Sequence, residues 1–198
     1  MVYISPGNRR MSLKTFSLPA EKTCPGATGL CKVNCYAKKA EVAWKNVLPS
    51  RKRNYKQSKK RKKFVKEMNN NIKNKGKYFR IHESGDFYNQ KYLNKWFQIC
   101  RDNPDVKFLA YTQMYKLDWS NMPDNMVRYW SIWPDTNNKY LPKNGLRAYV
   151  VDNGKGKIPK YKIEPKGKNC SKGMGSKVKC ENCKYCLEGK GDVIFKIH

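Results

Sequence analysis

Short segments of the chain alternate between apolar and polar residues, or are almost continuously apolar, as β-strands do. Six such segments cover residues 15–19, 77–83, 106–112, 126–133, 146–151 and 193–197. Largely apolar strands separated by long connections are typical of parallel sheets covered by other layers. The pattern therefore predicts an α/β fold over residues 1–198 as a single domain, with a mostly parallel sheet or an incomplete (β/α) barrel of about six strands.

Three segments between these strands have the periodicity of helices. The first covers residues 36–48, and Ser50 can cap a second that covers residues 50–71. The third, residues 89–101, is amphipathic. Cys100 lies on its apolar face, which indicates a core residue and not a metal ligand.

The charge balance is strongly basic. The chain has 43 Lys+Arg against 15 Asp+Glu, a formal net charge of +28. Such a chain attracts polyanions, so nucleic acid is the expected partner. The predicted helix 50–71 carries the densest group of basic residues: Arg51, Lys52, Arg53, Lys56, Lys59, Lys60, Arg61, Lys62 and Lys63. A solvated helix face, or a Lys- and Asn-rich composition from AT-rich coding, would explain the same residues without a partner.

The cellular compartment bears on how the eight cysteines are interpreted. Residues 1–11 are polar and lack the apolar core of a secretion signal, and no segment is apolar enough to span a bilayer. A cytoplasmic protein with no membrane contact is expected. In that reducing compartment clustered cysteines favour metal binding, whereas a secreted chain would form four disulfides.

Four cysteines lie late in the chain, within residues 165–190, which we predict to be a metal-binding segment. They are Cys170, Cys180, Cys183 and Cys186, and we call them the late cysteine set. A run with the spacing C-x2-C-x2-C and a distant fourth cysteine is closer to a ferredoxin-type ligand set than to the two separated pairs of a zinc ribbon. This spacing favours an iron–sulfur cluster, with zinc as the alternative.

Three further cysteines, Cys24, Cys31 and Cys35, lie in a loop rich in Gly and Pro near the start of the chain. We call them the early cysteine set. Three thiolates leave one coordination position open for a substrate or cofactor. His82 or a cysteine of the late set could instead close the site, and one merged site drawing on both sets is a further alternative. One or two metal centres are therefore expected.

Polar residues collect where the predicted strand 77–83 ends. The candidates for acid–base or ligand-binding roles are His82, Glu83, Ser84 and Asp86. Sites in parallel α/β folds form at the carboxyl ends of strands, which favours a functional role. A histidine at a strand end is as often a satisfied structural group.

Several motifs together resemble the gene-product-88 family of phage and bacterial proteins. They are Ser17-Leu18-Pro19-Ala20, Thr23-Cys24-Pro25-Gly26-Ala27, Cys31, Cys35-Tyr36-Ala37, His82-Glu83-Ser84-Gly85-Asp86-Phe87 and the late C-x2-C-x2-C run. The resemblance covers nearly the whole chain and implies a phage or mobile-element setting.

The layout also resembles radical SAM enzymes, in which three cysteines hold a [4Fe–4S] cluster whose open iron binds S-adenosylmethionine. By that resemblance the early cysteine set would hold the cluster, and Ser84, Gly85 and Asp86 would contact the cofactor. The spacing here is C-x6-C-x3-C, where that family has C-x3-C-x2-C. The likeness is one of layout.

Three functions remain open at this point. The first is an iron–sulfur protein associated with nucleic acid, which the second resemblance extends to a radical-SAM-like enzyme. The second is a non-catalytic DNA- or RNA-binding protein stabilised by zinc or by a cluster. The third is a phage protein that binds a host protein machine.

Overall fold

The computed structural model describes residues 1–7, 11, 13–73, 76–170 and 178–197. Within these residues seven strands form one sheet in which every neighbouring pair is parallel. The strands are β1 (Lys14–Phe16), β2 (Tyr78–Ile81), β3 (Lys107–Thr112), β4 (Met126–Ile132), β5 (Leu146–Val151), β6 (Lys168–Asn169) and β7 (Val193–Lys196). Their order is β1-β2-β3-β4-β5-β7-β6, so the sheet is open, with β1 and β6 at its edges.

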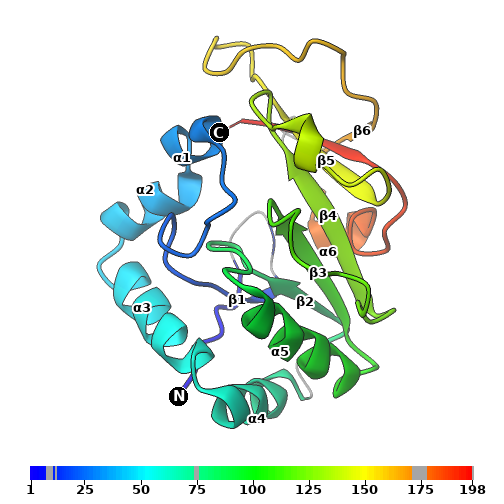
Figure 1. Ribbon diagram of the computed structural model, residues 1–198. Helices are drawn as coiled ribbons and strands as arrows, with labels where there is room; N and C mark the ends of the chain where they lie inside the picture. Colours follow the sequence, from blue (N-terminus) through cyan, green and yellow to red (C-terminus); the bar gives the residue numbers. More distant parts are fainter. Residues whose placement is uncertain (8–10, 12, 74–75, 171–177, 198) are drawn as a thin grey trace.

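The described helices lie in the connections between strands. They are α1 (Gly29–Val33), α2 (Tyr36–Ala43), α3 (Val47–Ser58), α4 (Arg61–Ile72), α5 (Gln90–Arg101) and α6 (Cys180–Cys183), with a 3-10 turn η1 (Asn138–Tyr140). In the sequence, α1 to α4 lie between β1 and β2, α5 between β2 and β3, and α6 between β6 and β7. Helices α1 to α4 follow one side of the molecule, α5 lies in front of the sheet, and α6 lies beyond it (Figure 1).

One face of the sheet packs against α4 and α5. Phe79 and Ile81 of β2 and Phe108 of β3 are almost completely buried there. Trp96 of α5 lies at the centre of this layer, with its ring centroid 6.1 Å from that of Phe79 and 6.0 Å from that of Phe64 in α4. The face is therefore a close-packed aromatic core.

The opposite face carries the alternate residues of the same strands, because successive side chains of a strand point to opposite sides. Leu109 and Tyr129 are buried on it, together with Leu187, which follows α6. Arg80 and Tyr111 also belong to this face, as shown by the guanidinium of Arg80 lying 5.2 Å from the ring centroid of Tyr111. This side of the sheet faces the cavity described below.

The predicted α/β fold with a mostly parallel sheet is confirmed, and each of the six predicted strands matches an observed strand. The seventh strand, β6, is only two residues long and has no apolar pattern that could have revealed it. None of the helices within the described residues is long and apolar enough to cross a membrane.

Two helix boundaries differ from prediction. The predicted helix 50–71 is two helices, because Lys60 has an extended backbone (φ −80°, ψ 110°) that separates α3 from α4. The predicted helix 36–48 ends at Ala43, and Pro49 lies in the first turn of α3. A proline is tolerated there because the N–H groups of a first turn have no partner within the helix.

Candidate functional site

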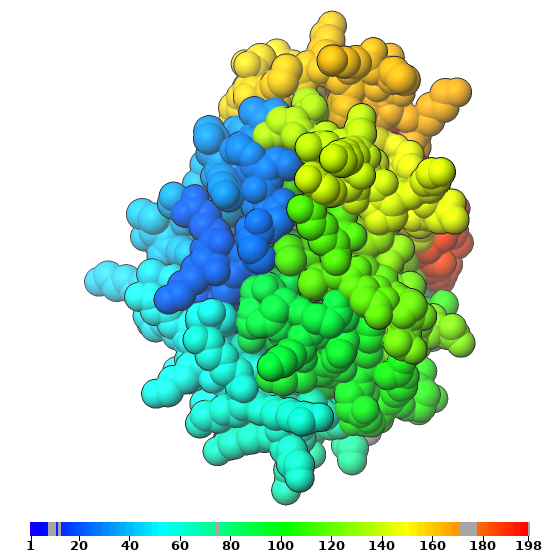
Figure 2. Space-filling view, viewed as in Figure 1, coloured from blue at the N-terminus to red at the C-terminus, as the bar shows by residue number. Residues whose placement is uncertain are grey.

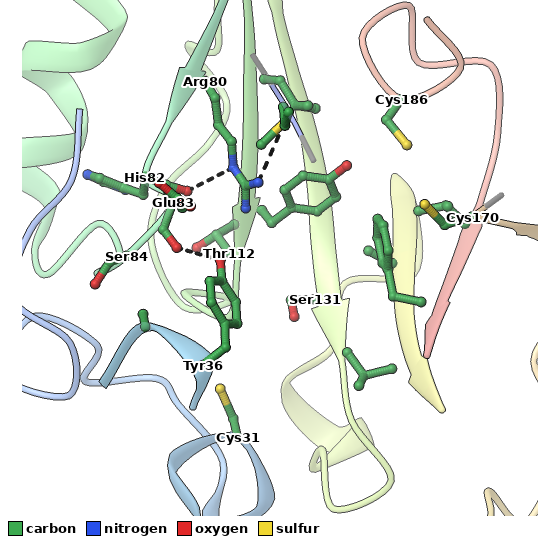
Figure 3. Close-up of a pocket in the computed structure, with 18 of the residues that line it drawn as sticks. Cys31, Tyr36, Arg80, His82, Glu83, Ser84, Thr112, Ser131, Cys170 and Cys186 are labelled. Carbon is green, nitrogen blue, oxygen red and sulfur yellow. Dashed lines mark hydrogen bonds between the residues drawn. The ribbon is translucent and has the colours of Figure 1, made fainter. Parts of the chain in front are cut away.

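A cavity of about 970 Å³ opens on the α6 side of the sheet. Its lining includes all seven cysteines of the two sets: Cys24, Cys31, Cys35, Cys170, Cys180, Cys183 and Cys186. In Figure 3, Cys31 lies on one side of this space near Tyr36, and Cys170 and Cys186 lie on another. The fold thus brings two sequence-distant cysteine sets to one cavity, although no sequence feature required them to share it.

The early cysteine set, predicted in a loop, is partly helical, because Cys31 lies in α1 and Cys35 directly precedes α2. Hydrogen bonds attach this segment to the carboxyl edge of the sheet. The backbone N–H of Thr28 donates to Oε1 of Gln113, which follows β3, at 3.1 Å. The N–H of Leu30 donates to Oδ2 of Asp135, which follows β4, at 2.8 Å. Gly26 is required by close packing, since a Cβ there would lie 2.5 Å from the carbonyl oxygen of Gln113. The early set therefore lies where parallel α/β folds place their sites.

The thiols of the early set are poor nucleophiles as they stand. Burial, reinforced by the nearby Asp86 carboxyl, raises the pKa of Cys24 to about 12. Burial also raises the pKa of Cys31 to about 11, although a hydrogen bond with Gln113 opposes the shift. Reactive cysteines have the opposite property, a lowered pKa. A bound metal would deprotonate such thiols outright, so metal binding suits them better than thiolate catalysis.

The late cysteine set lies over the face of the sheet. Cys180 and Cys183 form the two ends of the single-turn helix α6. The Cys186 thiol is hydrogen-bonded with Tyr111, and burial raises its pKa to about 11. The N–H of Cys170 donates to the carbonyl of Ile194 in β7 at 2.8 Å. Residues 171–177 of the predicted metal segment 165–190 lie outside the described residues.

No group of three or more His, Cys, Asp or Glu side chains within the described ranges is arranged to hold a metal ion. The expected metal-binding loops therefore remain a prediction. The ligands of a single zinc ion must all lie about 2.3 Å from one point. Cysteines that hold an iron–sulfur cluster bind different iron atoms of the cluster, so they need not converge on one point. The donor set, thiols around one cavity, has the chemistry of either an iron–sulfur or a zinc site.

His82 is buried at the end of β2, and its ring is only partly hydrogen-bonded, because Nδ1 has no partner within the described residues. It is 3% exposed, and its Nε2 lies 2.8 Å from the Tyr92 hydroxyl. Burial, with a smaller effect from the Arg80 charge, lowers its pKa to about 3. Figure 3 shows its ring directed away from Thr112 and the cysteines. The acid–base role of His82 therefore remains a prediction, for a ring that burial keeps neutral and that has one unpartnered nitrogen.

Residues 83–86 form a braced turn at the end of β2. The Ser84 hydroxyl donates to the Leu18 carbonyl at 2.8 Å. Asp86 is buried, and its carboxylate accepts from the Thr112 hydroxyl at 2.6 Å and the Gln113 N–H at 2.9 Å. Gly85 has a positive φ of 85° and no room for a Cβ beside Leu18. The carboxylate of Asp86 is engaged within the protein, and so is the hydroxyl of Ser84.

Glu83 remains beside the cavity with Ser84, Gly85 and Asp86, and all four line it. The main-chain carbonyl of Glu83 accepts a hydrogen bond from the Tyr36 hydroxyl at 2.5 Å. This contact ties α2 to the end of β2. The predicted catalytic and cofactor-binding residues therefore line the same cavity as the cysteines, and their roles remain a prediction.

Arg80 is a residue of the cavity that the sequence analysis missed. Its Nε donates to the His82 carbonyl at 3.1 Å, and its Nη1 lies 3.7 Å from the Met11 sulfur. The sequence contained a signal, since an arginine between Phe79 and Ile81 is a charge within an apolar strand. The alternation of strand side chains places it on the face opposite the aromatic core.

The predicted nucleic-acid residues are arranged on α3, on α4 and at their junction. Eight of the nine are exposed: Lys52, Arg53, Lys56, Lys59, Lys60, Arg61, Lys62 and Lys63. The two helices lie at the lower left and base of the molecule in Figure 2. Arg51 differs, because it is buried and its Nη1 forms an ion pair with Glu41 at 3.0 Å. It stabilises the contact of α2 with α3 and cannot be counted among the surface cations.

Comparison with known proteins gives a consistent result. The profile of the family described as Gene product 88 matches residues 4–191. The Gene 88 protein of Mycobacterium phage L5 is 30% identical over 196 residues, covering 87% of this chain and 81% of that protein. The Gene 88 protein of Mycobacterium phage D29 is 29% identical over 199 residues, with the same coverage. No solved structure matches the chain.

Proposed function

The chain belongs to the gene-product-88 family, and we propose that it is an iron–sulfur protein whose early cysteine set, Cys24, Cys31 and Cys35, holds a [4Fe–4S] cluster beside the cavity. The observation that carries the proposal is the shared cavity. Its position at the carboxyl edge of a parallel sheet is where ligands bind in such folds. The proposal includes a cytoplasmic location in an infected cell, because the relatives are phage proteins.

The proposal extends to a radical-SAM-like enzyme. Three cysteines would leave one iron of the cluster open to a cofactor in the cavity. In radical SAM enzymes, which the layout resembles, that cofactor is S-adenosylmethionine. Bound there, the cluster would supply one-electron chemistry. The protein's own residues would shape the space: Gly85 permits the tight turn after β2, and Asp86 fixes Thr112 and Gln113 at the end of β3.

The late cysteine set would hold a second metal centre on the same cavity. Cys180, Cys183 and Cys186 are half-buried and lie on the α6 side of the sheet. A second iron–sulfur cluster is our preference, and zinc is the alternative.

Metal analysis of anaerobically purified protein tests the proposal. We expect a brown protein that contains iron and acid-labile sulfide. A triple Cys24→Ser, Cys31→Ser, Cys35→Ser variant should lose part of that iron. Cys100→Ser should lose none and is the matched control, because Cys100 is completely buried in the aromatic core. A colourless protein with stoichiometric zinc would overturn the cluster.

The enzymatic extension has its own test. S-adenosylmethionine added to the reduced, reconstituted protein should change the EPR spectrum of the cluster and release 5′-deoxyadenosine. An unchanged spectrum with no 5′-deoxyadenosine would contradict the radical-SAM-like activity. It would not contradict the iron–sulfur cluster, which the metal analysis tests.

A second candidate, binding of DNA or RNA, is favoured by the exposed cations of α3 and α4. A Lys59→Gln, Lys60→Gln, Arg61→Gln, Lys62→Gln, Lys63→Gln variant should bind nucleic acid more weakly, with a shallower salt dependence. The matched control removes five exposed lysines elsewhere, namely Lys155, Lys157, Lys160, Lys162 and Lys166. If both variants weaken binding equally, the attraction is a property of the net charge and not of these helices.

A further inference from the structure

We propose that the cavity binds a small organic anion, a carboxylate or a phosphate, through the guanidinium of Arg80. The inference deepens the proposed function, since it concerns the same cavity, but it does not require that a metal be present. Its starting point is the guanidinium of Arg80, which lies beside an apolar part of a cavity wall that also carries Glu83, Asp86, Lys168 and Lys196.

The protein holds this guanidinium in a defined orientation. On β2, the neighbours Phe79 and Ile81 are buried in the core on the opposite face. The side chain of Arg80 is fixed by its hydrogen bond with the His82 carbonyl and by its position over the Tyr111 ring. A preorganised cation loses little conformational entropy when a ligand binds to it.

Arg80 retains unused donors. A guanidinium has five N–H groups, and the contacts with His82 and Met11 use two of them. Within the described ranges, no carboxylate lies within 4.0 Å of Arg80. The Glu83 carboxylate acts electrostatically on Arg80 but forms no ion pair with it within the described residues. A partly desolvated cation without a hydrogen-bonded counter-ion is unfavourable, and an anionic ligand would offset that cost.

Arg51 shows what the same fold does when an arginine is structural. That residue is 7% exposed, and its guanidinium donates to the Glu41 carboxylate at 3.0 Å and to the Ala37 carbonyl at 2.9 Å. Among the described residues, no carboxylate forms an ion pair with Arg80, and Glu83 acts on its charge only from beyond ion-pair distance. The contrast between the two arginines supports a ligand-binding role for Arg80.

The rest of the wall indicates the body of the ligand. Leu109, Tyr111, Val150 and Phe195 line the cavity with apolar surface. Its volume of about 970 Å³ is at the upper end of the range in which small molecules bind, and few polar groups in such pockets orient the ligand. An anionic group on an apolar or aromatic body therefore fits both Arg80 and its surroundings. In Figure 3 the guanidinium faces the open space that also reaches Cys170 and Cys186.

Binding of matched probes to the full chain tests the proposal. The probes are phenyl phosphate, phenylacetate and the neutral benzyl alcohol, measured by calorimetry at a constant ionic strength near 0.15 M. We expect at least one anion to bind more tightly than the alcohol. Arg80→Gln should weaken that anion about 10- to 100-fold, the range expected for loss of a charge-assisted hydrogen-bonded pair. Lys62→Gln, which removes one exposed surface charge, should change it less than twofold.

Arg80→Lys keeps the charge and removes the planar fork, so we expect intermediate binding even if Arg80→Gln does not fold. Equal binding of anions and alcohol to the wild type would overturn the proposal, and so would equal losses in Arg80→Gln and Lys62→Gln. Iron analysis of the same preparations separates this inference from the proposed function. Arg80-dependent anion binding without iron would overturn the cluster alone, whereas iron without anion binding would overturn the role of Arg80 alone.

Discussion

The two faces of the sheet are built from the same strands but have different partners. On one face, α4 and α5 cover Phe79, Ile81 and Phe108 with a layer of completely buried aromatic rings. On the other face, Tyr111 is only partly buried and lies beside a cavity with an arginine and seven cysteines around it. The first face is optimised for packing. The second keeps polar groups and cysteine thiols beside open space, which a protein built only for stability would fill.

The largest expected effect tests the packed face. Trp96→Ala should lower the free energy of unfolding by about 3–5 kcal/mol, because the ring is completely buried and its removal leaves a cavity in the core. Phe195→Ala on the cavity face should cost clearly less, since Phe195 is partly exposed already. Urea denaturation of both variants measures the difference. Equal losses would mean that the cavity wall is as tightly packed as the core.

His82 provides the next effect, a dependence on pH. In the folded protein the pKa of His82 is about 3, below its usual value of 6.5. As the pH falls, His82 therefore takes up a proton in the unfolded chain before it does so in the folded protein. The contribution of neutral His82 to stability is complete above pH 6.5 and is lost progressively between pH 6.5 and pH 3. Between pH 7 and pH 5 the loss is about 2 kcal/mol.

The variant His82→Asn isolates this contribution. Asparagine tolerates the positive φ of 62° at this position and has no proton to bind in this range. Its unfolding free energy, followed by denaturant titration from pH 7 to pH 5, should therefore fall by about 2 kcal/mol less than that of the wild type. Identical pH profiles would show that His82 is accessible to protons in the folded state.

Two cysteine substitutions, one on each face of the sheet, should have opposite effects on stability and on iron content. Cys100→Ser places a hydroxyl in the aromatic core and should cost about 1–3 kcal/mol. Cys31→Ser, at a half-buried position on the cavity, should change the stability of the chelator-treated protein by about 0.5 kcal/mol. Iron content should respond in the opposite order. If Cys100→Ser removed iron or Cys31→Ser unfolded the protein, the assignment of the two faces would be wrong.

The strands and the core could be predicted from the sequence because a buried strand requires a run or an alternation of apolar residues. Cys100 and the six apolar segments follow this rule. The shared cavity could not be predicted, since it depends on strand order and on how residues 28–30 attach to Gln113 and Asp135. The break at Lys60 and the burial of Arg51 were missed for a related reason. Lysine and arginine are usually solvated, and only the tertiary partner Glu41 makes Arg51 a buried residue.

The smallest expected change in stability concerns Tyr111, on the cavity face of the sheet. Tyr111 packs its ring against Tyr129 and Phe195, with centroid distances of 5.3 and 5.6 Å, and lies under Arg80. Tyr111→Phe keeps these contacts and removes only the hydroxyl that is hydrogen-bonded with Cys186. The expected loss is about 0.5–1 kcal/mol, because the exchange of a neutral hydrogen bond with solvent is nearly balanced. Denaturation of chelator-treated protein measures it, with Tyr111→Ala as the control that also removes the ring. A loss above about 2 kcal/mol, comparable with a core substitution, would show that polar contacts and not ring packing maintain the cavity wall.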